Sequence, residues 1–360
     1  QQNEPDIFKK IYKILLPKDY LRFKLTNTYF TDMSDASGTL WLDVKNRKWS
    51  DNLLNLTGVN TSHMPLLVEG NDPTAYLSKE IKNKFGFQHD VIVAGGAGDQ
   101  AAGAVGVGVI DSKQSMISLG TSGVYFSPTS KFSSNTNQAV HSFCHCLPNT
   151  WHHMSVMLSA TNCVNWISKM HGLQVGEAIS KGKIYFNNNF KQDSTPFFLP
   201  YLSGERTPYN DPFLRGSFHM INTLTSLESM IYAVIEGISF GIKDGFEAVH
   251  SVSHKDKDIY LVGGGSKSDF WADLIASVLN HEIIIGEDSN LGPALGVARL
   301  AMLATNEYKN SDIILNMKIL RTCNPSNKIS DQLLDRYKRW KVIADTNKSI
   351  SKKIMKKNNE

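Results

Sequence analysis

The segment that decides the fold spans residues 91–108 and has the sequence VIVAGGAGDQAAGAVGVG. The apolar run at residues 91–94 predicts a short strand, and the glycines after it allow a tight turn and the close approach of a ligand. Asp99 follows these glycines, at the predicted start of a helix whose small residues let another layer pack tightly against it. Asp99 is therefore either an ordinary helix N-cap or a functional carboxylate. A carboxylate just beyond the C-terminal end of a strand lies where open α/β sheets bind their ligands, which favours function.

Two further segments combine an apolar run with glycines. SMISLGTSGVYF at residues 115–126 predicts strand, turn and strand, and IYLVGGGSKSDFWADLIASVL at 259–279 predicts strand, loop and helix. Strands that alternate with helices predict an α/β architecture of packed layers. Residues 228–251 predict a long helix with a buried stripe along one face. The stripe consists of Ile231, Ile235, Ile238 and Ile242.

The pattern of apolar runs and glycine clusters changes near residue 90, which predicts a domain boundary. Residues 1–88 mix short apolar runs with turns, whereas the strand and glycine segments begin afterwards. We expect a remainder of one domain at 1–88, a second domain at 89–310, and a helical segment with a basic tail at 311–360. Within the second domain a helix is expected from Gly292, because Pro293 suits a first helical turn.

The turn at residues 120–123 is a candidate phosphate site. Successive backbone N–H groups in such a turn can form a concavity for an anion, and the hydroxyl groups of Thr121 and Ser122 add donors. A plain hairpin turn has the same composition, because Gly and Ser are common in turns. The segment alone leaves both interpretations open.

Residues 263–268 form a candidate nucleotide loop. Three glycines follow a predicted strand, and Ser268 stands at an N-cap position before a helix. A dinucleotide-binding fingerprint would need a glycine in place of Ser268, with Glu282 or Glu287 as its distal acid, and it would open a βαβ unit. The chain also has no G-x-x-x-x-G-K-[ST] motif. The loop suits a nucleotide, but it matches neither of these two standard sites.

The segment HSFCHCLPNTWHHM at residues 141–154 gathers six potential metal ligands: His141, Cys144, His145, Cys146, His152 and His153. Their spacing matches no standard zinc pattern, and alternation along paired strands would put them on opposite faces. We therefore expect buried structural residues rather than a metal site.

The composition narrows the class of protein. A chain of 360 residues with 41% hydrophobic content can bury one or two cores. It has no apolar run of 18 residues and no signal sequence at its start, so a cytoplasmic protein without a membrane partner is expected. Four cysteines are too few for a disulfide framework. The net charge of +4 comes largely from the C-terminal tail, and we expect no nucleic-acid partner.

Taken in order, these segments resemble the FGGY family of carbohydrate kinases, and within it the xylulose kinases. The resemblance extends from residue 4 to about residue 305. It is carried by LLPKDYLRFKLTNTYFTDMSDASGTLWLDV, AGGAGDQAAGAVGVG, SLGTSGVYF, HSFCHCLPNTWHHMSVMLSA, FFLPYLSGERTPYND, LVGGGSKSDFW and LGPALGVARLAML. Together they are specific, although any one of them alone would not be.

The resemblance implies two ribonuclease-H-like domains of the actin-like ATPase type that face a cleft, the first of them incomplete here. It implies that ATP phosphorylates D-xylulose to D-xylulose 5-phosphate, with Mg²⁺ as a cofactor whose protein ligands are unknown, and it leaves room for a homodimer. Asp99 matches the general base and, with Gln100, borders the sugar. The nucleotide-binding residues implied are Gly120, Thr121, Ser122, Gly263, Gly264, Gly265 and Lys267, with the helix from Gly292 close by.

The chain departs from the family pattern in two places. The second family signature has a glycine where Met220 stands and an acid or amide where Ser229 stands. At the N-terminus, NEPDIF resembles the end of the first signature, so a first phosphate hairpin, a metal-side Asp and a Met-His pair are expected upstream. We therefore expect residues 1–360 alone to lack kinase activity.

Three alternatives remain at this stage. The substrate could be another sugar or polyol, such as ribulose, gluconate or glycerol. The chain could be an inactive nucleotide-binding remnant, or a nicotinamide-dependent dehydrogenase that binds NAD and not ATP.

Overall fold

A computed structural model describes residues 1–252, 258–287, 289, 291–309 and 318–356. Its centre is a seven-stranded sheet with the order β15-β14-β13-β7-β8-β10-β9. β13 is parallel to β7 and β14, and the remaining pairs are antiparallel. The strands are β7 (Gln114–Leu119), β8 (Gly123–Thr129), β9 (His141–Cys144), β10 (Trp151–Met157), β13 (Asp258–Val262), β14 (Ile283–Gly286) and β15 (Ile319–Cys323).

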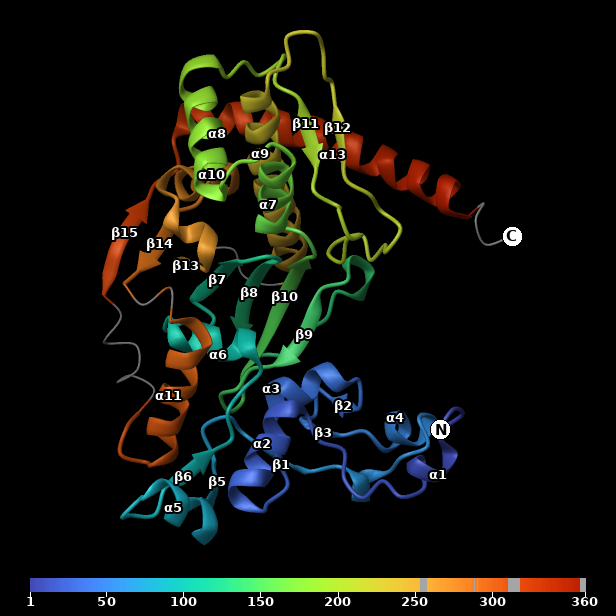
Figure 1. Ribbon diagram of the computed structural model, residues 1–360, viewed down its shortest axis with the longest axis vertical. Helices are drawn as coiled ribbons and strands as arrows, with labels where there is room; N and C mark the ends of the chain where they lie inside the picture. Colours follow the sequence, from blue (N-terminus) through green and yellow to red (C-terminus); the bar gives the residue numbers. More distant parts are fainter. Residues whose placement is uncertain (253–257, 288, 290, 310–317, 357–360) are drawn as a thin grey trace.

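Helices cover both faces of this sheet, as the α/β pattern predicted (Figure 1). Side chains alternate along each strand, so Ile117 and Leu119 enter one core while Met116 enters the other. The larger core lies under α7 (Thr161–Met170), α8 (Val175–Asn189), α9 (Leu227–His250), α10 (Asp269–Leu279) and α13 (Asn327–Lys356). The smaller core lies under α6 (Asp99–Gly106) and α11 (Gly292–Ala304).

The helix α9 is buried more completely than its sequence predicts. The expected stripe, Ile231 to Ile242, is in the core, but Glu236, Lys243 and Asp244 on other faces are also buried. Other helices and the sheet surround α9, and α13, about a hundred residues further along the chain, supplies polar partners to Glu236 and Asp244. The predicted long helix and its buried stripe are confirmed, whereas the burial of its other faces depends on distant elements that the local pattern does not show.

The helices α6 and α11 meet backbone to backbone. A Cβ atom at Gly106 would collide with the carbonyl oxygen of Gly292, and one at Gly296 with that of Ala102. The small-residue pattern after Asp99 thus does what the sequence predicts, since it allows another helix to approach closely. Pro293 lies in the first turn of α11, also as predicted.

The first 94 residues form the lower part of the molecule in Figure 1, built from short elements and two-stranded sheets. Pro17 starts a helix, as it often does. The helices are α1 (Pro5–Phe8), α2 (Pro17–Thr26), α3 (Met33–Ala36), α4 (Asp51–Leu56) and α5 (Lys79–Phe85). The strands are β1 (Phe30–Asp32), β2 (Leu42–Asp43), β3 (Lys48–Trp49), β4 (Leu66–Val68), β5 (Pro73–Tyr76) and β6 (Ile92–Ala94); β11 (Phe197–Leu199) pairs with β12 (Ser217–His219) elsewhere.

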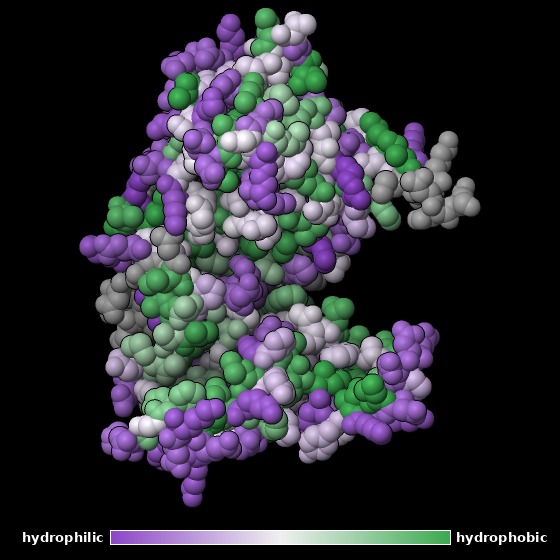
Figure 2. All heavy atoms as spheres, in the orientation of Figure 1, coloured by the Kyte–Doolittle hydropathy of each residue, from purple (hydrophilic) through white to green (hydrophobic). Residues whose placement is uncertain are grey.

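The molecule is hollowed at its waist, between this lower part and the part built on the large sheet (Figure 2). The segment between β6 and α6, which contains the glycines of residues 95–98, connects the two parts. No helix in the described ranges is long and apolar enough to cross a membrane. The domain limits at residues 88 and 310 stay predictions.

Candidate active site

Asp99 is the first residue of α6, and Gly98 occupies the N-cap position before it. The interpretation of Asp99 as an ordinary N-cap is therefore wrong. Its side chain is exposed, and its Oδ1 accepts a hydrogen bond from the backbone N–H of Gln100 at 2.9 Å. Asp99 is thus an accessible carboxylate on a well-packed helix.

A small cavity of 90 Å³ lies at Asp99, and the two parts of the chain line it together. Gly98, Asp99 and Gln100 come from the start of α6. The remaining residues are Ser34, Asp35 and Gly38 around α3, Ala101 from α6, and Phe143, His152 and Met154 from β9 and β10. Two carboxylates, an amide, a hydroxyl and an imidazole thus line a space of a few water molecules.

The residues from α3 and β10 were missed by sequence reasoning. Asp35 and Ser34 lie in the family-like segment MSDASGT, but nothing local distinguishes them from a helix cap. Burial raises the pKa of Asp35, an effect that Lys18 at 3.5 Å counters. Burial, followed by the neighbouring His145, holds the pKa of His152 well below its ordinary value, so this imidazole is neutral.

The turn at residues 120–123 joins β7 to β8, and its carbonyl groups are held by the start of α7. The backbone N–H and the hydroxyl group of Thr161 both donate to the carbonyl oxygen of Gly120, at 3.0 and 2.8 Å. The N–H of Ala160 donates to the carbonyl oxygen of Thr121 at 2.8 Å. Within the described ranges, the amides of Thr121 and Ser122 have no hydrogen-bond partner, and both residues are exposed. The turn therefore presents donors, which suits an anion.

The three glycines at residues 263–265 have three different surroundings. Gly263 has a φ of +90°, and a Cβ at Gly265 would collide with the side chain of Leu119, so backbone conformation and packing explain these two. A Cβ at Gly264 would meet nothing within 4 Å. Fold alone does not require a glycine at this position.

Gly264 and Lys267 border a cavity of 450 Å³ between α8 and the start of α10. Its other lining residues include Val175, Gly176 and Ile179 of α8. Ser268 is the N-cap of α10, as predicted, because its hydroxyl accepts from the N–H of Trp271. Leu119 touches both glycine segments, so the turn and the loop are neighbours at the ends of β7 and β13. The cavity at Asp99 is lined by residues of neither.

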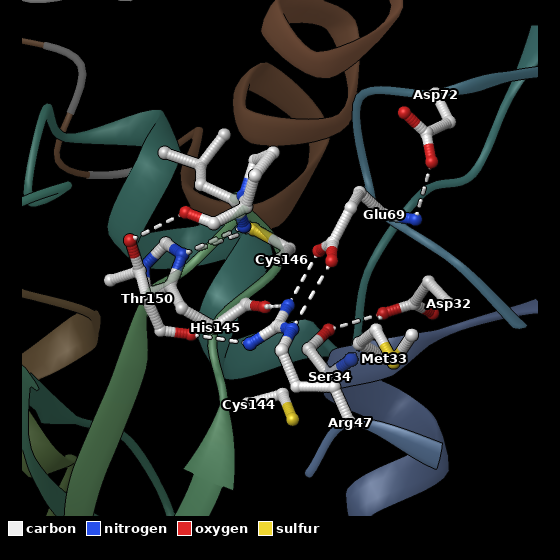
Figure 3. Close-up of polar contacts among 12 residues, drawn as sticks. Asp32, Met33, Ser34, Arg47, Glu69, Asp72, Cys144, His145, Cys146 and Thr150 are labelled. Carbon is white, nitrogen blue, oxygen red and sulfur yellow. Dashed lines mark hydrogen bonds and ion pairs between the residues drawn. The ribbon is translucent and has the colours of Figure 1, made fainter. Parts of the chain in front are cut away.

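Most histidines and cysteines of residues 141–154 are buried. Cys144, His145 and Cys146 contact residues of the lower part of the chain. Burial lowers the pKa of His145 to about 3. Among the described residues no group of three or more His, Cys, Asp or Glu side chains could hold a metal ion. Figure 3 shows what the segment does contact: Arg47 pairs with Glu69 and donates to the carbonyl oxygens of Thr150 and His145, at 2.8 and 3.5 Å.

Comparison with known proteins gives consistent matches. Residues 1–106 match the model of the N-terminal domain of the FGGY family of carbohydrate kinases, and residues 115–305 match that of its C-terminal domain. The chain is 44% identical over 311 residues to a xylulose kinase of Escherichia coli, which covers 86% of this chain and 63% of the relative. It is 42% identical to a xylulose kinase of Klebsiella pneumoniae, over 85% of this chain and 62% of that protein.

Among solved structures, the crystal structure of a xyloylose kinase from Brucella ovis superposes with a TM-score of 0.91 at 40% identity. The match covers 97% of this chain and 71% of that one. The fold is therefore the one expected from the sequence. The chain spans somewhat less than two thirds of the length of the two curated relatives.

Proposed function

Since the chain belongs to the FGGY family of carbohydrate kinases, we propose that it serves the ATP-dependent phosphorylation of D-xylulose to D-xylulose 5-phosphate, with Asp99 as the general base. The observation that carries the proposal is an exposed carboxylate at a helix N-terminus, which lines a small polar cavity between the two parts of the chain. The relatives named xylulose kinase support the choice of sugar.

The chemistry asks little of Asp99 beyond its position. The 5-hydroxyl oxygen forms a bond to the γ-phosphorus of ATP, the bond from that phosphorus to the β,γ-bridging oxygen breaks, and ADP leaves. The hydroxyl proton passes to the Asp99 carboxylate, mostly late in a loose transition state, so an ordinary carboxylate suffices. Positioning of the two substrates supplies most of the rate enhancement.

We assign the nucleotide to the two neighbouring glycine segments. The backbone amides of Thr121 and Ser122, which have no partner in the described ranges, suit phosphate oxygens, and Lys267 adds a positive charge beside the 450 Å³ cavity. Gly264 leaves its side open for the ligand. Gly120, Gly263 and Gly265 shape the backbone that presents these groups.

The family also implies Mg²⁺. The residues described by the structure contain no group of three metal-ligating side chains. We therefore assign no protein ligand and derive no step through the ion; Mg²⁺ in kinases is commonly held by substrate phosphates together with one or two carboxylates.

A cytoplasmic location completes the proposal. The four cysteines are free and buried, which agrees with a reducing compartment. A homodimer stays a prediction.

The central test is Asp99→Asn in the longest reading frame that contains these residues. D-xylulose-dependent ADP release should fall by about 10²–10⁴, while the dissociation constant for D-xylulose, measured by calorimetry, changes little. The assay includes D-ribulose, gluconate and glycerol. Preference for one of these would contradict D-xylulose as the substrate. Binding of NAD together with a failure to bind ATP would contradict the kinase assignment.

The nucleotide side is tested with Gly264→Val. The new side chain meets no atom within 4 Å of its Cβ, so the protein should fold, while the dissociation constant for ATP rises and that for sugar stays. Gly38→Val is the matched control, because its Cβ also meets nothing within 4 Å and it lines the other cavity. Unchanged ATP binding in Gly264→Val would remove this loop from the nucleotide site.

A further inference from the structure

The cavity at Asp99 contains a second carboxylate, that of Asp35. The two carboxylates come from separate parts of the chain that are fixed to each other. Ser34 in α3 donates from its hydroxyl to a carboxylate oxygen of Asp32 (Figure 3), and the same hydroxyl accepts from the N–H of Gly98 at 3.0 Å. This contact docks the start of α6 onto α3.

Asp35 lies directly beside the residue that precedes Asp99. A Cβ atom at Gly98 would be 3.6 Å from the Cα and from the Oδ1 of Asp35, which is ordinary van der Waals contact. The backbone N–H of Asp35 is fixed by Asp32 at 3.1 Å, so the residue cannot swing away as part of a mobile loop. Both carboxylates therefore border one cavity, and the segments that carry them are in contact at Gly98.

The side chain of Asp35 has hydrogen-bonding capacity that the described residues leave unused. Its closest charged partner is Lys18, whose Nζ lies 3.5 Å from Oδ2, while the same Nζ lies 2.7 Å from both Asp19 and Asp32. One third of the side chain is exposed. A carboxylate has about four acceptor sites, and the ion pair with Lys18 occupies one of them at most.

A second observation points to a ligand in the same cavity. His152 is 2% exposed, and its Nδ1 has no hydrogen-bond partner among the residues that the structure describes. The Oε1 of Gln100 is also without a partner there. Buried polar atoms without partners are rare in native proteins and need an explanation, such as a ligand or ordered water. The cavity thus offers several acceptors to a molecule that brings several O–H donors.

We propose that Asp35 is a substrate-binding residue that accepts a hydrogen bond from the sugar hydroxyl next to the one facing Asp99, which for a 5-kinase is the hydroxyl at C4. The proposal rests on the proposed function, because it takes the ligand to be a ketopentose. It deepens that function by assigning recognition of the C4 configuration to a residue of α3. Lys18 acts on Asp35 as a positioning residue.

The test uses Asp35→Asn in the full chain, with calorimetric binding of D-xylulose, L-ribulose and ATP. L-ribulose differs from D-xylulose only in the configuration at C4. The dissociation constant for D-xylulose should rise about tenfold to a hundredfold, the range expected for a lost hydrogen bond to a charged group. The preference for D-xylulose over L-ribulose should shrink with it, while ATP binding stays unchanged. A purely structural role would not change the preference between two epimers.

The control is Asp51→Asn, the same substitution at an exposed position of α4 that does not line the cavity. Unchanged D-xylulose binding or unchanged epimer preference in Asp35→Asn overturns the inference while the proposed function stands. Loss of D-xylulose binding by the unmodified chain on addition of EDTA would place a cation at Asp35, which also overturns it. Failure of the unmodified protein, made from the longest reading frame that contains these residues, to bind any ketopentose would instead count against the proposed function.

Discussion

Two buried ionic clusters, one in each part of the molecule, differ in how completely their polar atoms are hydrogen-bonded. Arg336 of α13 is fully buried with Glu236 of α9, and it donates from Nε and Nη2 to both carboxylate oxygens at 2.7 and 2.5 Å. Its remaining donors reach the carbonyl oxygens of Gln192, Thr195 and Pro196. The planar guanidinium is thereby satisfied on every side, which is the condition for a buried ion pair to be tolerated.

The cluster around Lys18 is less complete. Burial opposes the charge on Lys18, yet Asp32 and Asp19 raise its pKa above the ordinary value. In the described part of the chain, the Oδ2 of Asp19 and the Nη1 of Arg22 are buried without a hydrogen-bond partner. This cluster borders the cavity at Asp99 through Asp35. The Arg336 cluster, whose polar atoms all have partners, stabilises the fold. The Lys18 cluster, some of whose polar atoms have none among the described residues, lies where a ligand is expected.

Arg336→Met should break the first cluster with the largest effect. It leaves Glu236 buried with Tyr232 as its remaining hydrogen-bond donor, and the free energy of unfolding should fall by about 3–5 kcal/mol. Urea unfolding measures this, and ATP binding by the folded protein should not change. Adding Glu236→Leu to the variant should recover a large part of the loss, because the stranded charge is gone. If the double variant is as unstable as Arg336→Met, the loss in the free energy of unfolding comes from packing and not from the unpaired carboxylate.

Glu205 sharpens the comparison, because it is a buried carboxylate hydrogen-bonded to backbone amides rather than to a cation. Its Oε1 accepts from the N–H groups of Leu158 and Arg206, at 2.9 and 2.8 Å. Burial raises its pKa to about 8 from the ordinary 4.5. Between these values the folded protein holds a proton that the unfolded chain has lost, so stability should fall as pH rises, by at most about 1.4 kcal/mol per pH unit.

Glu205→Gln checks this sign. The free energy of unfolding is measured at several values between pH 5 and pH 8 for both proteins, and the difference between them isolates the contribution of Glu205. The variant should gain stability relative to the parent as pH rises. Parallel pH profiles would contradict the raised pKa.

Lys18→Met should weaken the second cluster by less than Arg336→Met weakens the first. It removes the cation between Asp19 and Asp32, but Arg22 remains 3.6 Å from Asp19 and Lys18 is itself partly exposed. We expect a loss of about 1–3 kcal/mol in the free energy of unfolding. Lys82→Met is the control: Lys82 pairs with the exposed Asp90, and its loss should cost under about 1 kcal/mol. Equal losses in the two variants would show that burial adds nothing to the Lys18 cluster.

Met220→Gly should give the smallest change, since it lies outside both clusters. Met220 has a φ of +59°, in the left-handed region that favours glycine, and its side chain is exposed. Relief of backbone strain, offset by the greater freedom of glycine in the unfolded chain, should leave the variant about 0.5 kcal/mol more stable. Met302→Gly, within α11, should instead lose about 1 kcal/mol. A loss of the same size at Met220 would show that the backbone there is not strained.

The sequence predicts those features that depend on neighbouring residues. The hairpin at residues 120–123, the cap at Ser268 and the helix start at Pro293 each follow from a few adjacent residues. The expected departure at Met220 is also local, and the positive φ there is of the kind that favours glycine.

Features that depend on distant residues could not be predicted. Asp35 and Asp99 are 64 residues apart in the chain, and His152 is a further 53 along, so no periodicity brings them to one cavity. Arg336 is likewise a hundred residues from Glu236. In each case the sequence contains the polar residues, but which of them lie together becomes visible in three dimensions alone.

The contact between α6 and α11 has a mechanical consequence. Packed helices slide past one another by small rotations of interlocking side chains, and here glycine and alanine backbones touch with few side chains between them. Because few side chains separate them, α6 and α11 are coupled through their backbones. A displacement of α11 is therefore passed on to the start of α6, where Asp99 lies.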